Sequence, residues 1–285
     1  MTPRTQFTLG DIFRISLSAY RQRFRSLMGI SLVFLLPFDI INAYVQLRYV
    51  GDSPTNWLAK VQTAHSLSEA IAAIPPVYTT WMPFVILLYS FGVLPLMAVA
   101  TSRVTVGMVV HGFDVPVQEA GNDAFRKWPM SFVTLFMAYG LYGVAVIVAS
   151  WIIGLCAGVA ASASQVLGVI VAVIGLLAAL VGSVWYWVRM AFVPYVIAEE
   201  KRGYFTALRR SFEITRGETW RLVGFFVALS FILSAADGFL LIVGSIFAVI
   251  PGLGAVVAVL ASIIVVPFSF VAVAVMYIDL RMRKA

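Results

Sequence analysis

The positively charged residues of this chain fall into four clusters, and long apolar stretches with almost no charge separate the clusters. Eighteen of the 20 Lys and Arg residues lie within the ranges 4–25, 103–127, 189–221 and 281–284. Basic residues that flank a transmembrane segment mark the cytoplasmic side of a membrane. The pattern therefore predicts a chain that crosses a membrane in pairs of helices, with both termini on the cytoplasmic side.

The composition favours a membrane protein and argues against nucleic-acid binding. Hydrophobic residues make up 61% of the 285 residues, charged residues make up 12%, and the mean hydropathy is +0.96. A soluble domain contains about 25% charged residues. A basic cytoplasmic surface accounts for the net charge of +7, and no groove of basic and aromatic residues is visible. Anionic lipid headgroups are therefore the expected partners, and nucleic acid is not.

A membrane-spanning helix needs about 20 apolar residues, and six stretches of the chain meet this requirement. They lie near residues 28–47, 81–102, 131–157, 166–190, 222–249 and 255–279. We therefore expect an all-α membrane protein in which residues 1–285 form a single polytopic domain with six transmembrane helices. The first outer connection is predicted to hold a short amphipathic helix on the membrane surface, between Ser53 and Pro76.

Two segments on the cytoplasmic side combine an apolar stripe with a basic face at helical spacing. Residues 8–28 and 204–222 have this pattern, which is typical of a helix that lies in the headgroup region. Thr8 and Asp11 resemble a loose capping box at the start of the first helix. In the second helix, the side chains expected to face the bilayer are Phe205, Leu208 and Phe212.

These two segments also indicate an internal repeat. They align at a constant offset of 195 residues, and a weaker copy lies at residues 117–131. The pattern predicts three pseudo-repeats, each an interfacial amphipathic helix followed by a transmembrane hairpin, over residues 8–103, 117–200 and 204–281. Chance matching of basic amphipathic helices is the alternative interpretation.

Polar residues inside the predicted spans are the first candidates for a functional site, because such residues are costly in a bilayer. Two stripes are found, made of Asp39, Asn42 and Gln46 in the first span and of Ser230, Ser234 and Asp237 in the fifth. They lie at similar depth and predict a polar intramembrane site between the first and fifth spans, for a polar solute, a proton or a lipid headgroup. Hydrogen bonding between packed helices is the alternative.

Arginines near the predicted inner surface are candidates for contacts with anionic lipid. The set consists of Arg14, Arg21, Arg25, Arg189, Arg209 and Arg216. Arg189 follows Trp185-Tyr186-Trp187, so it is either a snorkelling residue of an aromatic belt or a counter-ion for lipid phosphate. The acidic residues Glu199 and Glu200 alternate with basic ones and are expected on solvated faces.

No catalytic constellation is recognisable. His65 and His111 lie in predicted connections without a second ligand or nucleophile in register, and Cys156 is the single cysteine. No nucleophile elbow, P-loop or dinucleotide-binding fingerprint is found. We therefore expect no enzymatic activity, no cofactor and no metal.

Three stretches together resemble a known bacterial family. They are residues 7–13 with their continuation at 20–24, ALRRSFEITRGETWRL at 207–222, and PFSFVAVAVMYIDLRMR at 267–283. They are similar to the membrane domain of glycerophosphoryl diester phosphodiesterase and to related six-helix membrane proteins. The resemblance implies a six-helix architecture in a bacterial inner membrane. Some members attach a soluble phosphodiesterase barrel after the membrane region, and we expect neither that barrel nor its activity in this chain.

The expected function is a non-enzymatic one in the cytoplasmic membrane. We expect a multi-pass protein that interacts with lipids or serves as a scaffold or accessory protein, with a membrane protein or a second copy of the chain as a further partner. The alternative is a transporter or channel for a small solute or a lipid, with the polar site between the first and fifth spans. An intramembrane enzyme acting on a lipid ranks last.

Overall fold

The structure is a computed structural model that describes residues 7–49, 62–63, 66, 68–69, 80–200, 202–247 and 253–284. Within these residues the chain is helical apart from short connections, and no β-strand occurs. Six helices are long and apolar enough to cross a membrane, which is the number that the sequence predicts. The outer amphipathic helix predicted between Ser53 and Pro76 lies almost wholly outside the described residues.

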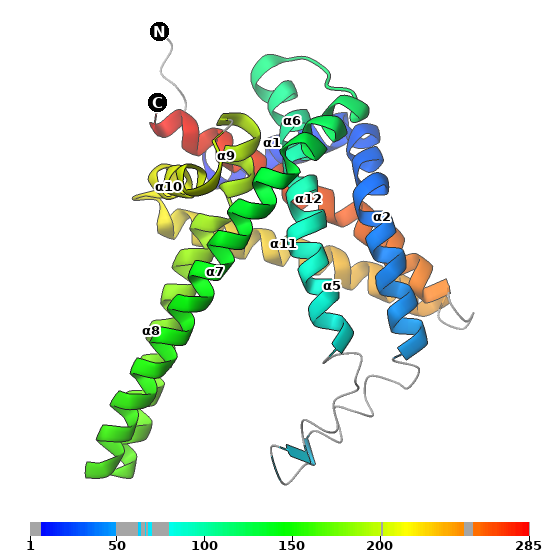
Figure 1. Cartoon of the computed structure of the whole chain (residues 1–285). Helices are drawn as coiled ribbons and strands as arrows, with labels where there is room; N and C mark the ends of the chain where they lie inside the picture. The colour runs from blue at the N-terminus through cyan, green and yellow to red at the C-terminus, as the bar shows by residue number, and fades with distance from the viewer. Residues whose placement is uncertain are drawn as a thin grey trace.

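The helices are named in Figure 1. In chain order they are α1 (Leu9–Gln22), α2 (Phe24–Tyr49), α5 (Met82–Leu88), α6 (Leu94–Val106), α7 (Val117–Ala163), α8 (Gln165–Met190), α9 (Val193–Glu200), α10 (Tyr204–Thr215), α11 (Thr219–Phe247) and α12 (Leu253–Lys284). A π-helical turn, Tyr89–Val93, joins α5 to α6, and a second one, Gly107–His111, follows α6.

The long helices form three hairpins that meet at one end of the molecule. The hairpins are α2 with α5–α6, α7 with α8, and α11 with α12, and the α7–α8 hairpin extends away from the other two (Figure 1). The short helices α1, α9 and α10 gather at the meeting end, together with the last turns of α12. We call this end the hub.

The core of the protein lies where α6 and α12 enter the hub. Residues 271–280 of α12 are all buried, and the most exposed of them, Val273, is only 8% exposed. Residues 97–106 of α6 are buried except for Arg103. Both stretches are rich in Ala and Val, and the stretch of α6 also contains Thr and Ser. Small side chains of this kind let neighbouring helices approach closely. Both helices therefore pack against partners on several sides.

The helix predicted at the N-terminus is present as α1, with its capping box. The Thr8 hydroxyl accepts a hydrogen bond from the Asp11 N–H (3.2 Å), and the Asp11 carboxylate accepts one from the Thr8 N–H (3.1 Å). The apolar face, however, packs on the protein as well as facing outward. Ile12 is fully buried and the Phe13 ring stacks on Phe225 of α11, whereas Leu17 is 49% exposed.

The second predicted amphipathic segment is divided into α10 and the start of α11. The break lies at Gly217, which has φ +87°, a left-handed conformation that glycine adopts without steric cost. Leu208 and Phe212 do not face the bilayer as predicted. Leu208 is 9% exposed, and the Phe212 ring packs edge-on against Trp185 of α8. Phe205 is 63% exposed, as expected for a lipid-facing side chain.

The third and weakest repeat copy is not a separate helix. Residues 117–131 and the predicted span at 131–157 form the single 47-residue helix α7, which continues through Pro129. A proline removes one backbone N–H, and membrane helices tolerate this loss when neighbouring groups satisfy the freed carbonyl. The three hairpins are therefore present, but only two of them follow a distinct short helix.

Candidate functional site

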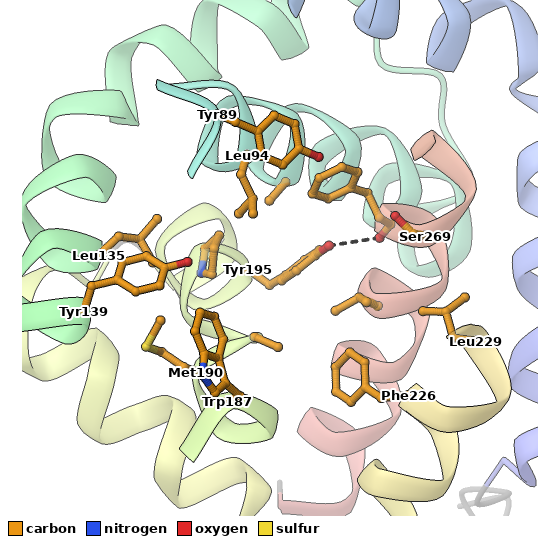
Figure 2. A pocket seen from close by; sticks show the side chains of 15 residues that line it. Tyr89, Leu94, Leu135, Tyr139, Trp187, Met190, Tyr195, Phe226, Leu229 and Ser269 are labelled. Carbon is orange, nitrogen blue, oxygen red and sulfur yellow. Dashed lines mark hydrogen bonds between the residues drawn. The ribbon is translucent and has the colours of Figure 1, made fainter. Parts of the chain in front are cut away.

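A cavity of about 300 Å³ lies inside the junction of the three hairpins (Figure 2). Its walls come from the π-helical turn between α5 and α6, from α6 and α7, from the end of α8 and the start of α9, and from α11 and α12. The lining residues are Tyr89, Leu94, Ala98, Leu135, Tyr139, Trp187, Met190, Ala191, Pro194, Tyr195, Phe226, Leu229, Ser269, Phe270 and Val273. We call this space the junction cavity.

Two interruptions of helical structure adjoin the junction cavity. On one side, the π-helical turn Tyr89–Val93 separates α5 from α6. On the other side, α8 ends at Met190 and α9 begins at Val193, and Pro194 lies in the first turn of α9. Proline at the start of a helix has no N–H that requires a partner, which fits a chain break at this point. Both interruptions contribute residues to the lining of the cavity, namely Tyr89 on one side and Ala191 and Pro194 on the other.

The wall of the junction cavity is aromatic and uncharged, with hydroxyl groups at its edge. The Tyr195 hydroxyl donates to the Phe270 carbonyl (3.1 Å), and the Ser269 hydroxyl donates to the Val266 carbonyl (2.7 Å). The hydroxyls of Tyr89 and Tyr139 form no hydrogen bond with any described residue, and Figure 2 shows the Tyr139 hydroxyl directed toward the middle of the cavity. The cavity therefore suits an apolar group that carries a hydrogen-bond acceptor.

The polar stripe of the first span contacts α12. Asp39 accepts a short hydrogen bond from the Ser262 hydroxyl of α12. Asn42 is partly buried, and its side-chain oxygen has no hydrogen-bond partner among the described residues. The side chain of Gln46 lies outside the described residues. Asp39 of α2 thus lies next to α12, and Asn42 follows it three positions later on α2.

The polar stripe of the fifth span lies elsewhere. Ser230 and Ser234 line a groove between α11 and α8, and Asp237 is exposed on α11. The structure therefore does not bring the two stripes together into the predicted site between the first and fifth spans. The physical reason is the position of α12, which packs against both α2 and α11 and supplies the partner of Asp39.

The candidate lipid-contacting arginines differ in their surroundings. Arg14, Arg21, Arg25 and Arg216 are exposed and have no carboxylate partner among the described residues. Arg209 is exposed but pairs with Glu213 at 3.0 Å. Arg189 is partly buried, with its guanidinium 4.2 Å from the centre of the Trp185 ring. Contact of these side chains with lipid stays a prediction.

A buried ionic cluster at the hub was not recognised from the sequence. Asp279 of α12 is 1% exposed and binds Arg221 (2.7 Å) and Arg283 (2.8 Å). Its other carboxylate oxygen accepts the Phe7 N–H (3.1 Å), while the two arginines donate to the Phe7 carbonyl. The only sequence signal was the spacing of Asp279 and Arg283, four residues apart on one helix face.

A second cluster corrects the expectation that Glu200 is solvated. The Glu200 side chain is 9% exposed, binds Arg210 at 3.0 Å and accepts a hydrogen bond from the Tyr277 hydroxyl (3.2 Å). Nearby, Asp123 binds Lys127 at 2.7 Å and Arg103 at 3.1 Å. Basic residues of the second, third and fourth clusters thus meet buried or half-buried acids at the hub. A buried carboxylate requires such partners because of the cost of desolvation.

These clusters resemble structural ion pairs more than a catalytic or metal centre. Each buried acid is already bound by cations, and no group of three His, Cys, Asp or Glu residues that could hold a metal ion occurs in the described part of the chain. Comparisons with protein-family models, with curated proteins and with solved structures find no match for this chain. The resemblance noted in three stretches of the sequence therefore stays a prediction.

Proposed function

We propose that this chain is a non-enzymatic, multi-pass protein of a bacterial cytoplasmic membrane, and that it binds one apolar chain or ring of a membrane lipid in the junction cavity. The observation that carries the proposal is the cavity itself, a partly open space that helices from all three hairpins border and that aromatic and aliphatic side chains line. A bound lipid would contact all three hairpins at once. Its binding would therefore favour one arrangement of the hairpins over others.

The size and chemistry of the junction cavity support an apolar ligand. About 300 Å³ is at the small end of the range for ligand pockets, so the cavity holds one acyl chain segment or one ring rather than a whole phospholipid. The free hydroxyls of Tyr89 and Tyr139 can donate to an ester or keto oxygen. Among the lining residues there is no charged side chain to compensate an ionic solute.

The orientation follows from the charge distribution. The basic clusters gather at the hub, and the positive-inside tendency assigns this end to the cytoplasm. Both described ends of the chain lie there, because the Phe7 N–H binds Asp279 near the end of α12. The ends of the hairpins that lie far from the hub then point toward the outer leaflet.

Transport of a proton or a small solute is the second candidate function. Its site would lie between the first and sixth spans, α2 and α12, and not between the first and fifth spans. The observation that favours it is the pair Asp39 and Ser262 between α2 and α12, with the unpartnered oxygen of Asn42 on the same helix. A protonatable carboxyl group within a bilayer is a candidate element of a proton or solute pathway. Asp39→Asn keeps the hydrogen-bonding shape and removes the charge, so transport with unchanged proton coupling in this variant would exclude the pathway.

The lipid proposal is tested by filling the junction cavity. Leu229 is 4% exposed and lines the cavity, whereas Leu180 of α8 is 61% exposed on the surface. We expect native mass spectrometry of the purified protein to detect co-purified lipid in the wild type and in Leu180→Trp, and to detect much less in Leu229→Trp. Equal lipid occupancy in both variants would contradict the proposal.

A second variant covers the risk that Leu229→Trp disturbs folding. Tyr139→Phe removes one free hydroxyl and keeps the shape of the wall. The loss of one hydrogen bond of about 1 kcal/mol predicts about a fivefold weaker occupancy by a lipid that uses this hydroxyl. The melting temperature of Tyr139→Phe should stay near that of the wild type, because the hydroxyl has no partner in the described protein.

A further inference from the structure

The guanidinium group of Arg189 is held by residues of its own helix α8 and of α10 and α11, and no carboxylate among the described residues pairs with it. It stacks on the Trp185 ring, lies 5.6 Å from the centre of the Phe212 ring, and donates to the Phe212 carbonyl (3.4 Å) and to the Thr219 hydroxyl (3.3 Å). Its Nε atom is buried and has no partner in the described part of the chain. An arginine held this way within a membrane-spanning helix is costly unless an anion compensates its charge.

A second cation lies in the turn whose flanking residues Arg189 binds. Arg216 is in the turn between α10 and α11, and Phe212 and Thr219, on the two sides of this turn, accept hydrogen bonds from Arg189. Arg189 and Arg216 therefore lie on segments that these hydrogen bonds join. No carboxylate among the described residues pairs with either one. Two arginines that lack a carboxylate partner in this part of the structure offer the positive charge and the N–H donors that a phosphate group requires.

An apolar groove begins next to these arginines. Val184 and Val188 of α8 form one wall, and Val223, Phe226, Val227, Ser230, Phe231 and Ser234 of α11 form the other. Val188 directly precedes Arg189, and Val223 lies one helical turn after Thr219. The hydrogen bond between Arg189 and Thr219 therefore lies next to the hub end of the groove, and α8 and α11 diverge away from the hub (Figure 1).

We propose that one glycerophospholipid binds at this place, with its phosphate against Arg189 and Arg216 and one acyl chain in the groove between α8 and α11. From Val223 to Ser234 the groove runs about 17 Å along α11, at 1.5 Å per residue. This length is close to one leaflet of a hydrocarbon core of about 30 Å. The headgroup site and the groove thus have the spacing of a lipid phosphate and its chain.

This site is separate from the junction cavity. The two share only Phe226, which contributes to both walls, and the phospholipid site does not require the cavity to be occupied. Ser230 and Ser234, which the sequence placed in a polar site with α2, are instead small residues of the groove wall. Their hydroxyls leave room for the chain without a charge that would repel it.

The headgroup half of the proposal is tested by removing one arginine at a time. Arg216→Gln removes the exposed cation of the site, and Arg209→Gln removes another exposed cation, which pairs with Glu213 instead. Both variants lose one positive charge near the same membrane surface. The probe is phosphatidylglycerol, titrated into delipidated protein in a neutral detergent and counted by native mass spectrometry. Inorganic phosphate in place of the lipid should not compete at equal concentration, because it cannot use the groove.

For Arg216→Gln we expect about a fivefold weaker apparent affinity for the first phosphatidylglycerol, as the loss of one lipid-facing cation predicts. For Arg209→Gln we expect a change of less than twofold. Equal weakening in both variants would show that only the total charge matters and would overturn the site. Equal binding in both variants and the wild type would also overturn it.

The groove half is tested with two valines of equal exposure. Val227 lines the groove and Val173 of α8 does not, and each is 50% exposed. Val227→Trp should weaken the same lipid binding severalfold, and Val173→Trp should not. If Val227→Trp leaves lipid binding intact but dissociates an oligomer, the groove holds a second copy of the chain and the proposal is wrong. Binding that is lost only in Leu229→Trp would overturn this site and leave the junction-cavity proposal standing.

Discussion

The Asp279 carboxylate lies 2.7 Å from Arg221 and also accepts the backbone N–H of Phe7, 272 positions earlier in the chain. This buried pair joins Phe7, which lies just before the N-cap of α1, to the first turn of α11 and the last turns of α12. Arg283 completes the cluster at 2.8 Å. The hub is thus held by one carboxylate that three segments, distant in sequence, share.

Asp279→Asn should destabilise the hub strongly. The substitution leaves Arg221 and Arg283, which are 18% and 16% exposed, without a buried counter-charge. Breaking a buried ion pair costs about 3–5 kcal/mol, so we expect a large fall of the melting temperature in detergent. The control is Glu213→Gln, whose carboxylate is 46% exposed and whose loss should change stability by less than about 1 kcal/mol. Equal melting temperatures of the two variants would contradict the role of Asp279.

The capping box of α1 should respond to acid. The hydrogen bonds from Thr8 hold the pKa of Asp11 below its ordinary value of 3.8. The ionised carboxylate therefore stabilises the folded state above pH 3.8, and this contribution disappears as the pH falls through the lowered pKa. The difference in melting temperature between wild type and Asp11→Ala should be constant at higher pH and shrink below this value. A difference in melting temperature that grows on acidification would show that the ionised Asp11 carboxylate does not stabilise the folded state.

Tyr20 should be insensitive to pH over the whole neutral and moderately alkaline range. Its hydroxyl donates to the Ile264 carbonyl (2.6 Å), and burial raises the pKa of Tyr20 to about 12. A raised pKa means that the stabilising neutral form persists above the ordinary value of 10 and is lost as the pH approaches 12. Tyr20→Phe should cost about 1 kcal/mol at pH 7 and at pH 9 alike. A cost that vanishes by pH 9 would contradict this assignment.

The direction of the chain in the membrane is tested by labelling introduced cysteines. In a Cys156→Ser background, cysteines at Ser18 of α1 and Thr206 of α10 lie at the hub, and a cysteine at Ser164 lies at the far end of the α7–α8 hairpin. An impermeant maleimide added to intact cells should label only the Ser164 position. Labelling of Ser18 or Thr206 from outside would reverse the proposed orientation.

Features fixed by neighbouring residues could be predicted from the sequence, and features that depend on distant contacts could not. The Thr8–Asp11 capping box and the number of apolar spans are local properties, and both are present in the structure. The partner of Asp39 is Ser262, 223 positions away, and no periodicity in the first span indicates it. The basic residues next to Glu200 in the sequence suggest a solvated side chain. In the fold, however, Arg210 and the Tyr277 hydroxyl bind its carboxylate.

The junction cavity also depends on contacts between segments that are distant in the sequence. Tyr89 lies in the π-helical turn between α5 and α6, Tyr139 in α7 and Tyr195 in α9, and the three side chains line one cavity only because these elements pack together. Aromatic residues near the ends of membrane spans are usual in interfacial belts. Nothing in the sequence therefore distinguished these tyrosines from the other aromatic residues.

Electron cryomicroscopy of the protein in lipid nanodiscs tests the central claim most directly. The account predicts an elongated non-protein density inside the junction cavity, bounded by Tyr139, Trp187 and Tyr195, in the wild type. The same density should be absent from Leu229→Trp. A wild-type map in which the side chains close the cavity, with no density between them, would contradict the account.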